Sequence, residues 1–270
     1  MQTGTACQTI VPLFRDPDAT SERVDEMLYG MAAEVGLRSA DGEWVQIRTR
    51  YGYSGWVKAD CLLVPDMLDD TWETKARVLI SHAFADLLSD PREDAPLLQT
   101  LTRGCLLRDP EDRIGRWSLV RLVGGEKAWV PTSALLTPEN RPVPGSEAWR
   151  ERVVNSALDY LGTQYRWGGK SPSGIDCSGL SFMAYFLNGV TLPRDADVQQ
   201  DFLAPIARDK AKKGDLLFSP GHVMICLGAG KYVHATGREG YVIVNSLDPM
   251  DSAYREDIDR NCREAGTLRI

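Results

Sequence analysis

The chain has 270 residues, of which 43% are hydrophobic and 26% are charged, and its formal net charge is −7. This composition is typical of a folded globular protein of about two domains, and it excludes a disordered or collagen-like chain. The excess of acidic residues disfavours nucleic acid as a partner, because the phosphate backbone would be repelled. No apolar run approaches the ~18 residues that a membrane span needs, so none is expected.

The N-terminus and the cysteines bear on the compartment. The segment from Met1 to Cys7 has neither a basic nor an apolar run, so we predict no signal peptide and no lipid anchor. The six cysteines are too sparse for a disulfide scaffold, and no two of them form a C-x-x-C pair. Reduced cysteines are typical of cytoplasmic proteins, which makes the cytoplasm the expected compartment and secretion the alternative.

The first half of the chain repeats itself at an offset of about 73 residues. Residues 44–48, Trp-Val-Gln-Ile-Arg, align with residues 117–121, Trp-Ser-Leu-Val-Arg. A second tryptophan follows the first by twelve residues in both copies, at Trp56 and Trp129. Each copy consists of short alternating apolar segments between Gly, Asp, Pro and Ser turns, a pattern typical of a small all-β barrel.

These barrels resemble bacterial SH3-like domains, and we place the first in residues 1–65. Residues 66–140 are expected to hold an acidic connector with a short helix, from Asp66 to Ala76, followed by the second barrel. The repeated tryptophans are interpreted as barrel core or groove floor, and a ligand-binding or wall-binding surface is the alternative. His82, in this β-rich half, is interpreted as structural.

A new domain is predicted for residues 141–270. Three prolines and a glycine in residues 137–145 can continue neither a strand nor a helix. Beyond them, apolar residues recur at helical spacing from Glu147 to Leu161, and Gly162 is expected to end that helix.

A second helix is predicted to begin at Cys177. The apolar residues that follow it recur at positions i, i+3, i+4 and i+7, and Asp176 before it is a good N-cap. Cys177 would then lie in the first helical turn. There the helix dipole favours a thiolate, so we expect the pKa of this cysteine to be lowered.

Two of the three histidines fall in one predicted β-hairpin. His222 begins one strand, His234 lies in the return strand, and a three-residue loop at 228–230 would put both on the same face. A thiolate, an imidazole to pair with it and a polar group to orient that imidazole form a nucleophile–base–orienter set. A zinc site made of Cys177, His222, His234 and Cys226 is the alternative, although its spacing matches no common zinc motif.

Six segments of residues 141–270 carry a more specific resemblance. In chain order they are Tyr165-Arg166-Trp167-Gly168-Gly169, Asp176-Cys177-Ser178-Gly179-Leu180, Leu192-Pro193-Arg194-Asp195-Ala196, Gly214-Asp215-Leu216, Gly221-His222-Val223 and His234-Ala235. This series resembles the NlpC-type cell-wall cysteine peptidases. The implied fold is α+β, with a papain-like catalytic domain preceded by two small all-β SH3-like barrels. That domain order is similar to the γ-D-glutamyl-L-diamino acid endopeptidases that trim murein peptides.

The resemblance implies a role for each matching catalytic residue. Cys177 would be the nucleophile, His222 the general base and later the acid, and His234 the group that fixes the tautomer of His222. Tyr165 matches a family tyrosine that lies beside the nucleophile and helps to stabilise the oxyanion. A backbone N–H at the helix start would be a second oxyanion donor.

The resemblance also implies substrate contacts. Asp176 and Ser178 match positions that touch the free N-terminal amine and the backbone of the substrate in murein-recycling relatives. Glu22 and Tyr53 match an acidic residue and a tyrosine of the first SH3-like domain that complete this amine pocket. In the Arg-Asp-Ala segment we expect Asp195 to contact substrate. Many relatives have serine at the next position, where this chain has alanine, so contacts there are expected from the backbone.

The implied reaction is hydrolysis of the bond between γ-D-Glu and L-Lys or meso-diaminopimelate. The substrate would be a murein tripeptide or tetrapeptide with a free N-terminal L-Ala. A monomer would act through an acyl-enzyme, with no metal or cofactor.

The sequence leaves three alternative functions open. They are a wall-targeted endopeptidase outside the cell, a non-catalytic binder of wall fragments, and a thiol acyltransferase. Sequence does not separate hydrolysis from transfer, because both begin with the same acyl-enzyme.

Overall fold

The computed structural model describes residues 2–64, 72 and 76–269. The chain divides into two compact units, residues 1–140 and 141–270, and each is described by itself. The predicted connector helix between the two repeats lies outside the described residues, except for Trp72 and Ala76. Among the described residues, no helix has the length and apolar character that crossing a membrane requires.

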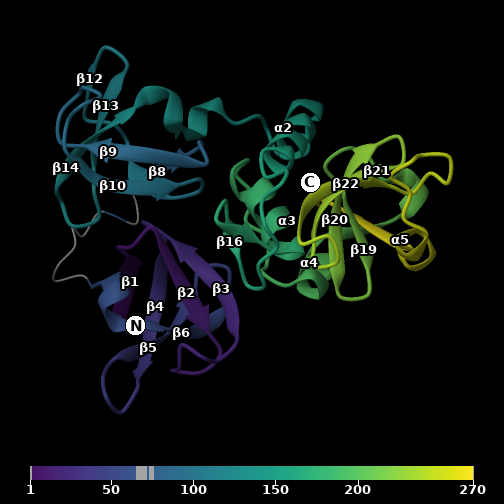
Figure 1. Ribbon diagram of the computed structural model, residues 1–270, viewed down its shortest axis with the longest axis horizontal. Coiled ribbons are helices and arrows are strands. Elements are labelled where there is room, and N and C mark those ends of the chain that lie inside the picture. The colour runs from purple at the N-terminus through teal and green to yellow at the C-terminus, as the bar shows by residue number, and fades with distance from the viewer. Residues whose placement is uncertain (1, 65–71, 73–75, 270) are drawn as a thin grey trace. The chain divides into compact units, whose positions relative to one another are not determined.

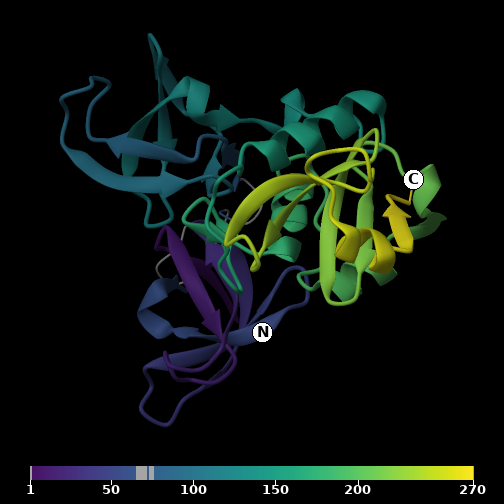
Figure 2. The ribbon, with the colours of Figure 1, turned by 45° about the vertical axis from the view of Figure 1, so that its right-hand side comes forward.

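The first unit holds both repeats, drawn from purple to teal in Figures 1 and 2. The first repeat is a seven-stranded sheet of order β3-β2-β6-β5-β4-β1-β7, and the second combines a sheet of order β10-β9-β14-β13-β12 with one of order β11-β8-β15. The strands of the first repeat are β1 (Gln2–Ala6), β2 (Ile10–Phe14), β3 (Arg23–Leu28), β4 (Ala32–Arg38), β5 (Trp44–Thr49), β6 (Ser54–Lys58) and β7 (Leu62–Leu63). Those of the second are β8 (Ala76–Ile80), β9 (Phe84–Leu88), β10 (Leu97–Thr102), β11 (Leu106–Arg108), β12 (Asp112–Ile114), β13 (Trp117–Arg121), β14 (Lys127–Pro131) and β15 (Leu135–Leu136).

The strand register confirms that the two segments are structural repeats. Gln46 pairs with Trp56 across β5 and β6, and the equivalent pair in β13 and β14 is Leu119 with Trp129. The first tryptophan of each repeat, Trp44 or Trp117, is buried, as the core interpretation predicts. Trp56 and Trp129 are only half-buried, so they lie at the edge of the core.

The second unit is a mixed α and β domain, so the predicted α+β class is confirmed. Its main sheet is antiparallel, with the order β18-β23-β19-β20-β21-β22. The strands are β16 (Lys170–Ser171), β17 (Gly174–Ile175), β18 (Ala204–Ala207), β19 (Leu216–Ser219), β20 (His222–Gly228), β21 (Lys231–Thr236), β22 (Tyr241–Ser246) and β23 (Glu264–Thr267). The helices are α2 (Glu147–Leu158), α3 (Cys177–Phe186), α4 (Ala196–Phe202) and α5 (Glu256–Asn261).

Helix α2 ends at Leu158, before the predicted end at Leu161. The chain leaves the helix through i→i+3 turns, and Gly162 adopts a φ of 77°. The N–H of Gly162 bonds to the carbonyl of Val242 in β22 at 3.0 Å. Pairing with the sheet therefore ends the helix one turn early.

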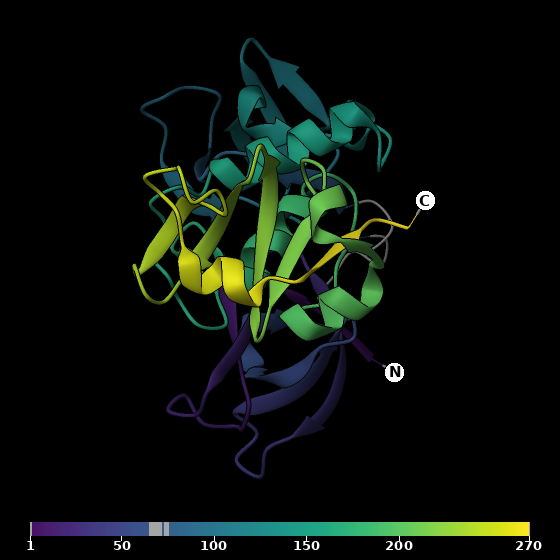
Figure 3. The ribbon, with the colours of Figure 1, turned by 90° about the vertical axis from the view of Figure 1, so that its right-hand side faces the viewer.

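Helices cover both faces of the main sheet. Helix α3 lies against β20 and β21, and its residues from Ser178 to Tyr185 are buried. On the other face, Met224 and Tyr232 pack with Ile258 of α5 in one hydrophobic cluster. Figures 1 and 3 show the sheet between these helices. The nucleophile candidate thus begins a helix that is fixed by burial along most of its length.

The β20–β21 hairpin closes differently from the prediction. Ile225 pairs with Val233, but the register shifts before Gly228 pairs with Lys231, so Leu227 forms a β-bulge. The connecting loop is therefore two residues long, not three. The register beyond the bulge still puts His234 opposite Met224, as predicted.

The start of α3 approaches a glycine-rich loop very closely. A Cβ atom added to Gly179 would lie 2.2 Å from the carbonyl oxygen of Gly169. No side chain fits this contact without movement of the backbone. Glycine at position 179 lets the nucleophile helix rest directly on the loop that carries Tyr165.

We expect Gly179→Ala to lower the stability of the second unit by about 1–3 kcal/mol, because the added methyl group overpacks a backbone contact. In an unstrained helix the same change would stabilise by about 0.5–1 kcal/mol. Urea unfolding followed by circular dichroism measures the difference. Gly36→Ala is the control, since the nearest atom to its added Cβ is 3.4 Å away. A Gly179→Ala protein as stable as wild type would contradict the close approach.

Candidate active site

Asp176 joins three segments of the second unit. Its Oδ1 accepts a 2.7 Å hydrogen bond from the N–H of Gly179, which confirms the predicted N-cap of α3. Its Oδ2 accepts a 2.8 Å bond from the N–H of Gly168 in the glycine-rich loop. Arg194 donates to both oxygens, at 3.0 Å and 2.8 Å, and both side chains are buried. This carboxylate therefore fixes the helix start, the loop and Arg194 together.

The same network includes Ser178. Its hydroxyl donates to Asp176 at 3.3 Å and accepts from Arg194 at 2.8 Å. A carboxylate has about four lone-pair sites, and those of Asp176 already receive protein donors. A substrate ammonium group at Asp176 would have to share oxygens that are already hydrogen-bonded.

Cys177 occupies the first turn of α3 and keeps partial exposure to solvent. The backbone N–H groups of Val223 and Ser178 can donate to its sulfur, and the first of these places the sulfur against the start of β20. Burial, followed by the charge of Asp176, nevertheless raises the pKa of the Cys177 thiol to about 11. The predicted lowering of this pKa is therefore wrong, because tertiary burial and a neighbouring carboxylate outweigh the helix start.

A line of hydrogen bonds runs from His222 into the sheet. Its Nε2 lies 2.7 Å from Nδ1 of His234, and Nε2 of His234 lies 3.0 Å from Oδ1 of Asn245. Asn245 in turn donates from Nδ2 to the carbonyl of Ala253 at 3.3 Å. The two histidines that the hairpin pattern placed on one face are thus in direct contact.

This line determines the tautomers of both rings. Because Nδ2 of Asn245 donates to Ala253, its Oδ1 faces His234 and must accept. His234 therefore carries its proton on Nε2, and its Nδ1 accepts from Nε2 of His222. Nδ1 of His222 is left unprotonated, which is the form that a general base requires.

Both imidazoles are neutral near pH 7. Burial, His234 and Arg255 together lower the pKa of His222 to about 3. Burial also lowers the pKa of His234, although its bond to Asn245 acts in the opposite direction. The resting site consequently holds a neutral thiol and a neutral imidazole.

Tyr165 lies next to the nucleophile. Burial raises the pKa of its phenol to about 12, and the nearby charges of Cys177 and Asp176 act in the same direction. Its backbone N–H bonds to the carbonyl of Gly240 at 2.7 Å, and a Cβ added to Gly237 would lie 3.5 Å from its ring. The phenol stays protonated over the physiological range and can donate a hydrogen bond.

The sequence prediction did not include Asn245. This residue follows the apolar stretch from Tyr241 to Val244. It pairs with Tyr232 across β21 and β22. A polar residue at the end of an apolar strand next to a histidine strand was the available signal. Only the register of the two strands shows that its side chain reaches His234.

The other predicted substrate residues lie at separate places. Glu22 forms a 2.6 Å ion pair with Arg15, and the backbone of Tyr53 bonds to Thr49, both within the first unit. Asp195 stands at the N-cap position of α4, where its carbonyl accepts from Gln199 at 2.9 Å. Their contacts with substrate remain predictions.

The side chains of the zinc alternative do not gather around one point. Within residues 2–64, 72 and 76–269, no three His, Cys, Asp or Glu side chains are grouped so that they could hold a metal ion. The facing nitrogens of His222 and His234 are instead bonded to each other.

We expect alkylation of Cys177 by iodoacetamide to accelerate about tenfold per pH unit from pH 7 to 9, because only the thiolate reacts and its pKa is raised. Peptide mass spectrometry follows the modification of this cysteine alone. His222→Ala is expected to keep the same slope, since no ion pair with His222 forms the thiolate at rest. A rate that levels off above pH 7 would instead indicate a stabilised thiolate.

Two family descriptions match the chain. Residues 162–258 match the NlpC/P60 family, and residues 13–62 match the bacterial dipeptidyl-peptidase SH3 domain. The first range contains Cys177, both paired histidines and Asn245.

Whole-length relatives agree with these matches. Dipeptidyl-peptidase 6 of Lysinibacillus sphaericus is 40% identical over 95% of this chain and 96% of its own length. Gamma-D-glutamyl-L-lysine dipeptidyl-peptidase of Bacillus subtilis is 28% identical over 86% of this chain and 78% of that protein. The crystal structure of an NlpC/P60 family protein from Bacillus cereus shares the fold, with a TM-score of 0.84 at 20% identity over 98% of this chain and 99% of that one. With its cysteine–histidine–histidine site, this chain is a cysteine peptidase and belongs to the NlpC/P60 family.

Proposed function

We propose that this protein hydrolyses the bond between γ-D-Glu and an L-diamino acid, L-Lys or meso-diaminopimelate, in murein peptides with a free N-terminal L-Ala. The proposal includes a cytoplasmic role in cell-wall recycling. The observation that carries it is the His222–His234–Asn245 line, which starts one residue before Val223, whose N–H donates to the sulfur of Cys177. The chain also aligns with the dipeptidyl-peptidase relatives over most of its length. Their names, dipeptidyl-peptidase 6 and gamma-D-glutamyl-L-lysine dipeptidyl-peptidase, support the choice of bond.

The chemistry of acylation follows from the protonation states. Nδ1 of His222 takes the thiol proton as the sulfur of Cys177 attacks the γ-carbonyl carbon of D-Glu. The N–H groups of Val223 and Ser178 stabilise the sulfur while it carries charge. The protonated phenol of Tyr165 and a backbone N–H at the start of α3 stabilise the oxyanion.

Breakdown of the intermediate uses the same base as an acid. The imidazolium of His222 donates its proton to the departing amine of the diamino acid, which leaves a thioester on Cys177. His222, neutral again, then takes a proton from water as the hydroxyl oxygen attacks the thioester carbon. Release of the L-Ala-γ-D-Glu carboxylate returns the proton to the sulfur.

Recognition of the free L-Ala amine is the finer part of the proposal. Asp176 and Ser178 lie closest in sequence to the nucleophile, and Glu22, Tyr53 and Asp195 are the further candidates. Because Asp176 is already bonded to Arg194, we assign it the electrostatic attraction of the ammonium group and leave direct contact to the less buried candidates.

Mass spectrometry of the products tests the function. L-Ala-γ-D-Glu-L-Lys and its diaminopimelate analogue are expected to release L-Ala-D-Glu, and N-acetylated peptides are expected to stay intact. Cys177→Ala should abolish cleavage. Cleavage of acetylated peptides or intact sacculi would favour a wall-targeted endopeptidase outside the cell. A Cys177-dependent product joined to an added amine would favour an acyltransferase, and no reaction would contradict the proposal.

Asn245→Ala is expected to lower kcat about 10- to 100-fold with little change in KM, because His234 loses the partner that fixes its tautomer.

In wild type, activity should fall only well below the ordinary histidine pKa of about 6.5, since the base form of His222 is favoured by its lowered pKa. Asn245→Asp keeps an acceptor but adds a negative charge, which raises the histidine pKa values and moves the acid limb of kcat/KM to higher pH.

Asn155→Ala, on the exposed side of α2, is the matched control and should leave kcat and the pH profile unchanged. An acid limb at the same pH in wild type and Asn245→Asp would show that Asn245 is only structural.

A further inference from the structure

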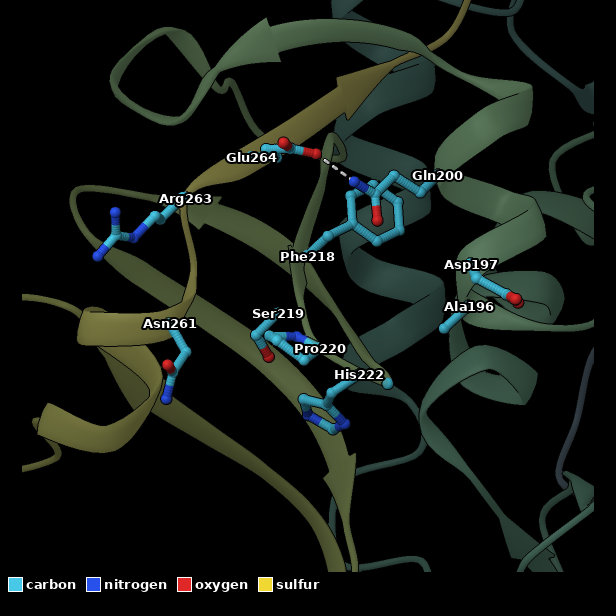
Figure 4. A pocket seen from close by; sticks show the side chains of 11 residues that line it. Ala196, Asp197, Gln200, Phe218, Ser219, Pro220, His222, Asn261, Arg263 and Glu264 are labelled. Atoms are coloured by element: carbon cyan, nitrogen blue, oxygen red, sulfur yellow. Dashed lines mark hydrogen bonds between the residues drawn. The ribbon is translucent and has the colours of Figure 1, made fainter.

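A pocket with a volume of about 320 Å³ opens beside His222 in the second unit (Figure 4). It lies between the start of α4, the β19–β20 turn and the segment that joins α5 to β23. Its lining includes Asp197, Gln200, Ser219, His222, Arg263 and Glu264.

The position of His222 identifies which side of the substrate this pocket serves. In the proposed reaction His222 gives its proton to the departing amine, so the departing residue must lie beside its ring. Cys177, Asp176 and Tyr165 do not line the pocket. The pocket thus shares His222 with the catalytic site but none of the residues assigned to the acyl part of the substrate.

The charges around the pocket match the departing residue. Arg263 and Asp197 are exposed and stand on opposite sides of the pocket rim, with their charged ends directed outward in the view of Figure 4. Within residues 141–269, neither side chain forms an ion pair. Glu264 accepts a hydrogen bond from Gln200, which holds this second carboxylate at the pocket wall. An L-diamino acid at the end of a tripeptide carries a carboxylate and a side-chain ammonium group.

We propose that this pocket binds the departing L-diamino acid, with Arg263 facing its α-carboxylate and Asp197, assisted by Glu264, facing its side-chain ammonium. The assignment rests on the proposed function. It makes the enzyme prefer tripeptides, whose diamino acid ends in a free carboxylate, over tetrapeptides, in which that group is an amide.

Four peptides separate the two charges. L-Ala-γ-D-Glu-L-Lys carries both, the lysinamide peptide lacks the carboxylate, the L-norleucine peptide lacks the ammonium group, and a tetrapeptide ending in D-Ala replaces the carboxylate by an amide. For wild type, kcat/KM is expected to fall about two- to fivefold with each loss, the range of exposed charge contacts.

Each pocket variant should lose only the preference for the charge that its residue is proposed to bind. Arg263→Gln is expected to lower kcat/KM about fivefold for the lysine peptide and to leave the lysinamide peptide unchanged. Asp197→Asn is expected to lower it about fivefold for the lysine peptide and to leave the norleucine peptide unchanged. Lys210→Gln and Asp209→Asn, exposed charges outside the pocket, are the controls and should change no ratio.

The outcomes distinguish the pocket from the activity. If wild type cleaves none of the four peptides, the proposed function fails, and the pocket assignment fails with it. If wild type cleaves the lysine peptide but Arg263→Gln and Asp197→Asn slow all peptides equally, or none, the activity stands and the pocket assignment is overturned.

Discussion

The buried ion pair of Asp176 with Arg194 is the interaction on which the geometry of the catalytic unit depends. One carboxylate caps the helix that begins with Cys177, accepts from the loop that follows Tyr165, and receives both amino groups of Arg194. Removing one partner of such a pair leaves an uncompensated buried charge, at a cost of about 3–5 kcal/mol. Burial raises the pKa of the Cys177 thiol, and the same carboxylate raises it further. The group that positions the nucleophile therefore also helps to keep it protonated at rest.

A protonated nucleophile makes the tautomer of His222 decisive. The base has to be neutral and to present an unprotonated nitrogen, and both conditions follow from the line through His234 and Asn245. That line ends on the carbonyl of Ala253, which also accepts from the N–H of Ser246 at 3.0 Å. A backbone carbonyl oxygen can only accept, and the second bond holds this one in place. The direction of every hydrogen bond back to His222 is thus fixed by the main chain, and the line itself carries no charge until the substrate is attacked.

Much of this architecture could be predicted from local sequence pattern. The 73-residue offset appears again in the strand register, because the same alternation of side chains specifies the same pairing in both repeats. The N-cap and the shared face of His222 and His234 follow from helical and strand periodicity. What sequence did not predict depends on tertiary packing. Burial decides the pKa of Cys177, and Asn245 meets His234 only through the register of β21 with β22. The bulge at Leu227 shortened a loop without changing the faces of the strands.

Catalysis depends on polar groups in the protein interior, whereas the proposed selectivity depends on charges that are exposed to solvent. The hydrogen-bond line lies in the protein interior, where one misplaced proton disables the base, so its loss should affect the chemical step by orders of magnitude. Arg263 and Asp197 stand in water, which screens each contact to a few-fold effect. A pocket of this kind cannot reject a wrong residue strongly by itself. If the proposed function holds, strict choice of the murein bond has to come from the acyl side of the substrate, because a site that hydrogen-bonds a substrate group strongly rejects analogues that lack that group.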